Sequence, residues 1–208
     1  MNGNELVERG GIPRLVRKLK RAMGPAGIFF KGFLENPRMV GAIVPSSSVT
    51  INLMLERVDW ANTKLFVEYG PGVGTFCQPV LDRLPRDGEL LVIDTNPLFV
   101  DYLSKTVTDS RFRAVLGSAE DVEEIVKSIG HDKADYVLSG LPFSTLPDGV
   151  GPAIASATAR VIRKGGAFLT YQYTSVARDY CKQYFPRVEK GFTFWNIPPC
   201  FLGWAWQD

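Results

Sequence analysis

Short apolar runs alternate with helix-like segments along most of this chain, and this alternation limits the possible folds more than any other feature. The runs cover residues 64–69, 89–93, 112–116, 134–139 and 166–173. Helical patterns follow them near residues 75–84, 97–108, 119–129, 150–164 and 176–184. Strands that alternate with helices in this way form a mostly parallel sheet covered by helices on both faces. We therefore predict an α/β domain.

The two ends of this pattern differ from its middle. Residues 187–195 and 201–207 read as strands with only a Pro-containing connection between them, which predicts an antiparallel hairpin that completes a seven-stranded sheet. Upstream, residues 46–58 read as a helix, and the serines at 46–48 supply its N-cap.

The composition narrows the class of protein. The 208 residues are 45% hydrophobic with a mean hydropathy of −0.01, and no apolar run approaches the roughly 18 residues that span a bilayer. The first residues lack the pattern of a secretory signal, so we expect a cytoplasmic protein. The only histidine, His131, and three scattered cysteines favour neither a zinc site nor a histidine-based hydrolase, and we expect no metal.

The first segment carries the basic character of the chain. Residues 1–35 hold seven Lys/Arg and three Glu, and residues 12–34 hold no acid at all. Apolar residues within 12–23 recur at helical spacing, which predicts a basic amphipathic helix. Such a helix can lie on an anionic membrane surface, pack on the main domain, or meet nucleic-acid phosphate. We divide the chain into an N-terminal helical segment, 1–45, and a main domain, 46–208.

A glycine-rich turn, V-E-Y-G-P-G-V-G, follows the first predicted strand. Glycines at alternate positions let the backbone bend sharply and let a ligand approach its N–H groups. A dinucleotide site would carry a third glycine where Thr75 stands, and Glu68 would repel a pyrophosphate. The turn therefore favours a cationic ligand.

Two later strand ends extend this site. Asp94 ends the second strand, where a carboxylate can accept hydrogen bonds from both ribose hydroxyls. The segment G-S-A-E-D at 117–121 ends the third strand, where Ala119 and Glu120 could frame an adenine. Groups for an ammonium, a ribose and an adenine together indicate S-adenosylmethionine. The predicted cofactor residues are Glu68, Tyr69, Gly70, Gly72, Gly74, Thr75, Asp94, Thr95, Ser118, Ala119, Glu120 and Ser139.

These three motifs resemble those of the class I S-adenosylmethionine-dependent methyltransferases over residues 60–208. The resemblance implies a Rossmann-like sheet of seven strands with an antiparallel last strand. Adding N-P-R-M-V-G-A-I-V-P-S-S and S-G-L-P-F-S, the chain is similar to the soluble bacterial phospholipid N-methyltransferases. That family methylates phosphatidylethanolamine stepwise to phosphatidylcholine, and its N-terminal amphipathic helix holds the enzyme on the lipid surface. The resemblance thus implies a peripheral enzyme on the inner face of the cell membrane, attached through residues 12–34, and we expect a monomer.

Ribosomal-RNA adenine dimethylases share part of this pattern and form the alternative. They carry N-L-P-Y where this chain has Ser139-Gly140-Leu141-Pro142-Phe143, and their C-terminal helical domain has no room here. Both departures disfavour a nucleic-acid partner. A lipid-binding protein that retains the fold without the activity is a third possibility.

The acceptor residues are less constrained by the sequence. Methyl transfer is an in-line displacement that needs a neutral amine, with no metal or covalent intermediate. We predict that Tyr171 and Tyr173, at the end of the fifth strand, position the acceptor, because aromatic faces attract methylated ammonium groups. Phe143 and Tyr69 could complete an aromatic wall. For the substrate phosphate, two sets of cations remain open: Arg178 and Lys182, or Arg14, Arg17 and Lys18.

Overall fold

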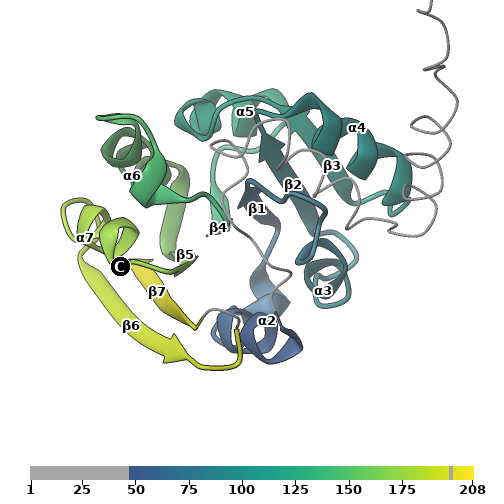
Figure 1. Ribbon diagram of the computed structural model, residues 1–208. Helices are drawn as coiled ribbons and strands as arrows, with labels where there is room; N and C mark the ends of the chain where they lie inside the picture. Colours follow the sequence, from purple (N-terminus) through teal and green to yellow (C-terminus); the bar gives the residue numbers. More distant parts are fainter. Residues whose placement is uncertain (1–46, 197–198) are drawn as a thin grey trace, which may run out of the picture.

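The computed structural model describes residues 47–196 and 199–208, and in them one sheet runs in the order β3-β2-β1-β4-β5-β7-β6 (Figure 1). Its strands are β1 (Leu65–Tyr69), β2 (Glu89–Asp94), β3 (Phe112–Leu116), β4 (Ala134–Ser139), β5 (Ile162–Gln172), β6 (Arg187–Thr193) and β7 (Cys200–Gln207). The pairs among β1 to β5 are parallel, whereas β7 is antiparallel to both β5 and β6. The predicted seven-stranded α/β sheet with a C-terminal hairpin is confirmed.

Helices cover both faces of this sheet (Figure 1). They are α2 (Ser48–Leu55), α3 (Cys77–Leu81), α4 (Pro97–Thr106), α5 (Val122–Ser128), α6 (Val150–Val161) and α7 (Val176–Cys181), with short 3₁₀ turns at Trp60–Asn62, Ala119–Asp121 and Phe143–Thr145. Side chains of α2, α3 and α4 enter one buried apolar cluster, and those of α5, α6 and α7 enter another. The sheet therefore has a separate core on each face.

The predicted N-terminal segment, 1–45, lies outside the described residues. The helix predicted to follow it begins as expected, since the Ser47 hydroxyl accepts a hydrogen bond of 3.2 Å from the Thr50 N–H. Such a cap contributes about 1 kcal/mol to helix stability. None of the helices in the described part of the chain has the length and apolarity that crossing a bilayer demands.

The central strand β1 is buried along its whole length, and its side chains alternate between the two cores. Phe66 lies in the cluster with α2 and α3, whereas Val67 and Tyr69 lie in the cluster with α5 and α6. Glu68, between Val67 and Tyr69, therefore faces the α3 side. This alternation decides where each residue of the glycine-turn motif can act.

The start of β1 is fixed by a buried carboxylate at the amino edge of the sheet. Asp135 Oδ2 accepts hydrogen bonds from the backbone N–H groups of Lys64 and Leu65 at 2.7 and 2.8 Å, and Arg163 pairs with its other oxygen. A buried carboxylate is tolerated only when it is paired and hydrogen-bonded, as this one is. The Asp135 contacts at the amino edge of the sheet are thus structural, whereas the residues predicted to bind the cofactor lie at the carboxyl edge.

The boundary between α6 and β5 differs from the prediction. Helix α6 ends at Val161 and β5 begins at Ile162, although the sequence predicted helix to 164 and strand from 166. A shift of register against β4 between Ala134 and Tyr136 accommodates the additional strand residues. Gly165, with a φ of 77°, takes a backbone conformation that other residues rarely adopt.

Candidate cofactor and acceptor site

The carboxyl ends of four neighbouring strands form the candidate site. Beyond the strands themselves, backbone hydrogen bonds of 2.9–3.0 Å join Gly70 N to Ile93 O, Gly117 N to Asp94 O, and Gly140 N to Tyr69 O. These bonds hold the tips of β3, β2, β1 and β4 side by side. The chain leaves β1 for β2 on one side, while β4 pairs with β1 on the other. In open α/β sheets a ligand binds in the crevice at such a reversal of strand order.

The three glycines of the turn are required for different reasons. All have positive φ, at 61° for Gly70, 56° for Gly72 and 82° for Gly74. A Cβ on Gly70 would lie 2.8 Å from Leu141 Cδ2, and one on Gly74 would lie 2.6 Å from Leu103 Cδ2. A Cβ on Gly72 would meet no heavy atom within 4 Å. Gly72 is therefore the point at which the turn leaves open space for a ligand.

Glu68 lies beneath this turn and is only 1% exposed. The pKa of its carboxyl is raised to about 8, mainly by burial and in smaller part by the neighbouring Asp94. The Cys77 thiol, at the start of α3, is 3.8 Å from Glu68 Oε2 and is the side-chain partner that opposes the rise in pKa. Because a nearby cation would stabilise the charged form, this carboxyl suits a cationic ligand.

Asp94 lies at the end of β2, as predicted, and faces the glycine turn. Its Oδ1 accepts a hydrogen bond of 2.8 Å from Asn96 N. Burial raises its pKa to about 6, against hydrogen bonds from the backbone N–H groups of Asn96, Gly72 and Thr95. The contact with Gly72 joins the second strand tip to the open part of the turn. The Thr95 side chain is exposed beside it.

The third strand tip presents the segment predicted to hold the adenine. The Ser118 hydroxyl accepts a hydrogen bond of 3.2 Å from Glu120 N and caps the 3₁₀ turn. Ala119 is buried against the α5 side, whereas Glu120 is exposed. The Glu120 carboxylate is thus free of the core and lies next to a small apolar residue, as an adenine site requires.

The fourth strand tip is organised by a residue that sequence reasoning did not assign. Ser139 is fully buried and its hydroxyl accepts a hydrogen bond of 3.2 Å from Leu141 N. Gln172 of β5 donates from Nε2 to the Leu141 carbonyl at 2.8 Å. These bonds fix the loop whose Leu141 packs against Gly70. The glutamine that ends the run F-L-T-Y-Q was the sequence signal that could have identified this role.

The predicted aromatic wall is not assembled as one surface, which corrects the sequence interpretation. Tyr69 points into the α6 side of the core, where its hydroxyl lies 3.1 Å from Thr158 Oγ1. Phe143 is 3% exposed and packs against Phe168 in the same core. Tyr171 lies on the opposite face, with its ring 5.1 Å from that of Phe76. Alternation along the strands separates these side chains, which the sequence treated as neighbours.

Tyr173 remains accessible at the end of β5. It is 38% exposed, and the Asn196 side chain, itself buried, hydrogen-bonds it and lowers its otherwise raised pKa. Burial raises the pKa of the Tyr171 phenol well above its usual range, and the nearby Glu68 carboxylate also acts to raise it. One tyrosine therefore faces the buried acid and the other faces solvent. Asn196 was missed because it follows the sixth strand, 23 residues away in the sequence.

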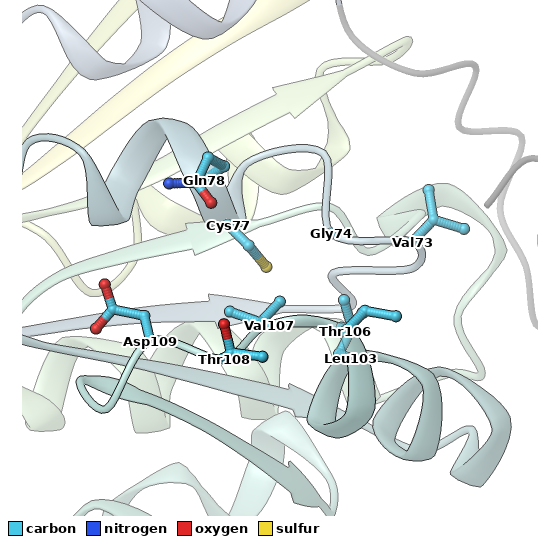
Figure 2. A pocket seen from close by; sticks show the side chains of 9 residues that line it. All are labelled: Val73, Gly74, Cys77, Gln78, Leu103, Thr106, Val107, Thr108 and Asp109. Carbon is cyan, nitrogen blue, oxygen red and sulfur yellow. The ribbon is translucent and has the colours of Figure 1, made fainter. Parts of the chain in front are cut away.

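A hollow of about 380 Å³ lies behind the glycine turn, between α3 and the end of α4 (Figure 2). Its lining comprises Val73, Gly74, Cys77, Gln78, Leu103, Thr106, Val107, Thr108 and Asp109. Only Gly74 among them belongs to the predicted cofactor set, and none of the other strand tips contributes. The hollow is thus distinct from the site at the strand ends.

The residues at the strand ends fit S-adenosylmethionine. A buried carboxyl with a raised pKa, the space above Gly72 and the carboxylate of Asp94 lie at adjoining tips. The carboxyl could pair with an ammonium, the space above Gly72 lets a ligand approach the backbone closely, and Asp94 could accept hydrogen bonds from a pair of hydroxyls. Among residues 47–196 and 199–208, no cluster of three or more His, Cys, Asp or Glu could hold a metal ion.

Comparisons with known proteins agree with this geometry. No protein-family model matches the chain. The ornithine lipid N-methyltransferase of Singulisphaera acidiphila is 26% identical over 176 residues, which are 83% of this chain and 91% of that protein. The ribosomal RNA small subunit methyltransferase H of Nitrosomonas eutropha is 28% identical over 97 residues, but these are 45% of this chain and 30% of that protein.

A solved methyltransferase structure has a similar fold. The N-methyltransferase NodS from Bradyrhizobium japonicum, in complex with S-adenosyl-L-homocysteine, superposes with a TM-score of 0.56. The two chains are 12% identical, and the match covers 76% of this chain and 83% of that one. With the strand order and the motifs at the strand ends, this places the chain in the class I S-adenosylmethionine-dependent methyltransferase fold.

Proposed function

We propose that this protein transfers a methyl group from S-adenosylmethionine to the amine of a membrane lipid. The proposed acceptors are phosphatidylethanolamine and its mono- and dimethyl derivatives, on the route to phosphatidylcholine. The observation that carries the proposal is the match to a lipid N-methyltransferase along nearly the whole length of both chains. The motifs resembling phospholipid N-methyltransferases support the choice of phosphatidylethanolamine.

Each group of proposed cofactor residues binds a different part of S-adenosylmethionine. The turn at Gly70 to Gly74 and the Glu68 carboxyl hold the methionyl end, and Asp94 accepts from the ribose hydroxyls. Ala119 and Glu120 frame the adenine. The cofactor supplies an electrophilic methyl group on a sulfonium. The protein's part is to align the amine with that methyl group and to exclude water, since the reaction is an in-line displacement.

The proposed acceptor side is formed by Tyr173 and by the face of Tyr171. The amine must lose its proton before each transfer, because only a free lone pair attacks the methyl carbon. An aromatic face then stabilises the methylated product by about 0.5–2 kcal/mol. For the lipid phosphate, Arg178 of α7 is the better placed of the candidates within the described residues. Its Nε is buried without a hydrogen-bond partner, next to Thr170 and Gln172 of β5.

A second lipid acceptor is favoured by one observation: the Singulisphaera relative is an ornithine lipid N-methyltransferase. Ornithine lipid also presents a primary amine, but it lacks a phosphate. Purified protein with labelled S-adenosylmethionine and vesicles of either lipid separates the two acceptors. We expect thin-layer separation to show mono-, di- and trimethylated phosphatidylethanolamine. Label in ornithine lipid alone would show that ornithine lipid, not phosphatidylethanolamine, is the acceptor. Label in ribosomal RNA with none in either lipid would refute the proposal.

We also propose that the enzyme acts as a monomer on the inner face of the cell membrane, with residues 12–34 as one attachment. Six Lys/Arg in that segment provide about 1 kcal/mol each near an anionic surface, before the cost of ordering. Deleting residues 1–22 should reduce sedimentation with anionic vesicles and leave cofactor affinity unchanged. Undiminished sedimentation would show that the segment has another role.

A further inference from the structure

Four large aromatic side chains are exposed together where β6 passes into β7. This aromatic tip consists of Phe192, Phe194, Trp195 and Phe201, which are 46%, 79%, 70% and 40% exposed. The Phe192 ring lies 4.8 Å from that of Phe194 and 5.1 Å from that of Phe201. The three phenylalanine rings therefore form one apolar surface, with the exposed Trp195 next to Phe194 in the chain, and such a patch commonly marks an interaction site.

The aromatic tip lies at the same edge of the sheet as the candidate site. Phe201 pairs with Gln172 at the carboxyl end of β5, and Phe192 pairs with Phe201. The next residue of the chain after Gln172 is Tyr173, the proposed acceptor residue. Asn196, the residue after Trp195, hydrogen-bonds Tyr173. Whatever covers the tip is therefore held against the acceptor side of the protein.

The charges around the tip are complementary to lipid phosphates. Lys190 is exposed and, two residues from Phe192, lies on the same face of β6. Arg178 lines a small hollow together with Phe201, and its Nε makes no hydrogen bond among the described residues, although Asp179 Oδ1 lies 3.9 Å from it. The acid of the strand, Glu189, points to the other face, where it pairs with Arg57 and Arg187.

We propose that the aromatic tip inserts into the interface of a phospholipid membrane, with Lys190 and Arg178 against the phosphates. Tryptophan and phenylalanine beside cations are suited to the boundary between headgroups and acyl chains. Insertion there turns the strand ends toward the bilayer, so that a lipid amine reaches the site without leaving the membrane. The inference rests on the proposed lipid substrate and adds a docking surface separate from residues 12–34.

The exposed Trp195 provides a direct test with the full chain. Vesicles of phosphatidylethanolamine and phosphatidylglycerol, with and without brominated acyl chains, are titrated while tryptophan fluorescence is measured. We expect bromine to quench the wild type, and Trp195→Phe to bind equally while losing that quenching. The double variant Phe194→Ser/Trp195→Ser should bind roughly tenfold more weakly, because two large apolar side chains no longer leave water.

Tyr184→Ser is the matched control, since Tyr184 is an exposed aromatic residue that precedes β6, at the other edge of the sheet. It should bind vesicles like the wild type. Unquenched Trp195 in vesicle-bound protein would overturn the proposal. So would a Trp195 that is shielded in solution and becomes exposed on deletion of residues 1–22, or a dimer that the double variant abolishes.

A separate measurement distinguishes this inference from the proposed function. Methyl transfer to phosphatidylethanolamine in detergent micelles should persist in the double variant with kcat within about twofold of the wild type, because the variant keeps the strand ends intact. Absence of transfer in both proteins would exclude phosphatidylethanolamine as the acceptor and leave the quenching result to decide the docking surface.

Discussion

Cys77 Sγ lies 3.8 Å from Glu68 Oε2, and both groups are buried beneath the glycine turn. The thiol is the carboxyl's side-chain partner, and burial raises the pKa of the thiol well above its usual range. The pair therefore carries little charge at neutral pH until a cation arrives. This relationship leads to the first prediction.

Binding of S-adenosylmethionine should release protons from Glu68. With a pKa of about 8 the carboxyl is mostly protonated at pH 7, and an approaching ammonium lowers the pKa because it stabilises the carboxylate. Calorimetry in two buffers of different ionisation enthalpy measures the release, which Glu68→Gln should abolish. Asp101→Asn, on the exposed part of α4, should leave it unchanged. Equal heats in both buffers for the wild type would show that Glu68 keeps its proton.

The same group should make the free energy of unfolding depend on pH. Between the ordinary pKa of 4.5 and about 8, the folded chain holds a proton on Glu68 that the unfolded chain has lost. Stability therefore falls as pH rises through this window, by up to about 1.4 kcal/mol per pH unit for one proton. Denaturant titrations from pH 5 to 8 should show a flatter dependence in Glu68→Gln. An identical slope in both proteins would contradict the raised pKa.

Gly72→Ala should lower cofactor affinity by more than its effect on stability explains. The positive φ costs an alanine about 1–2 kcal/mol, but no atom lies within 4 Å of the added carbon. Gly130→Ala is the matched control, because its φ is 93° and its surroundings are equally open at the end of α5. Both variants should lose similar stability in denaturant, and only Gly72→Ala should bind S-adenosylmethionine more weakly. Equal affinities would remove Gly72 from the site.

Gly74→Ala should be the more destabilising change in the turn. Its Cβ would lie 2.6 Å from Leu103 Cδ2 and 3.1 Å from Cys77 Sγ, so that α3 and α4 must move apart. We expect a loss roughly 1–3 kcal/mol beyond that of Gly72→Ala, as is usual for overpacking. The double variant Gly74→Ala/Leu103→Ala removes the atom at 2.6 Å and tests the cause, since in the Leu103→Ala background Gly74→Ala should cost only about as much as Gly72→Ala, the penalty of the positive φ.

Substitution of Tyr171, in β5, and of Tyr173, directly after it, should have different effects on stability and on kinetics. Tyr171 packs against Phe76, so Tyr171→Ala should lose roughly 2–4 kcal/mol of stability. Tyr173 is partly exposed, and Tyr173→Ala should cost less than about 1 kcal/mol while lowering kcat/KM for the lipid with cofactor affinity unchanged. Wild-type kcat/KM in Tyr173→Ala would exclude it from the acceptor site.

Local sequence patterns predicted most of the fold because each element carries its own signal. The apolar runs specify the strands from neighbouring residues alone. The helix starts are equally local, as shown by Ser47 before α2 and by Asn96 with Pro97 at the start of α4. Helices α3 and α7 are shorter than predicted, and α6 ends earlier because β5 begins at Ile162, where it pairs with β4. That pairing joins residues far apart in the sequence.

The sequence by itself determined the succession of strands along the chain and the chemical groups at their ends. Glu68, the glycines, Asp94 and the G-S-A-E-D segment are local motifs, and their order along the chain indicated the cofactor. Only the tertiary structure decided which side chains share a face, because burial on both sides of a central strand removes the polar alternation that would reveal it. It separated Tyr69 from Glu68, joined Asn196 to Tyr173, and gathered the aromatic tip at the carboxyl edge of the sheet, where we propose that the acceptor binds.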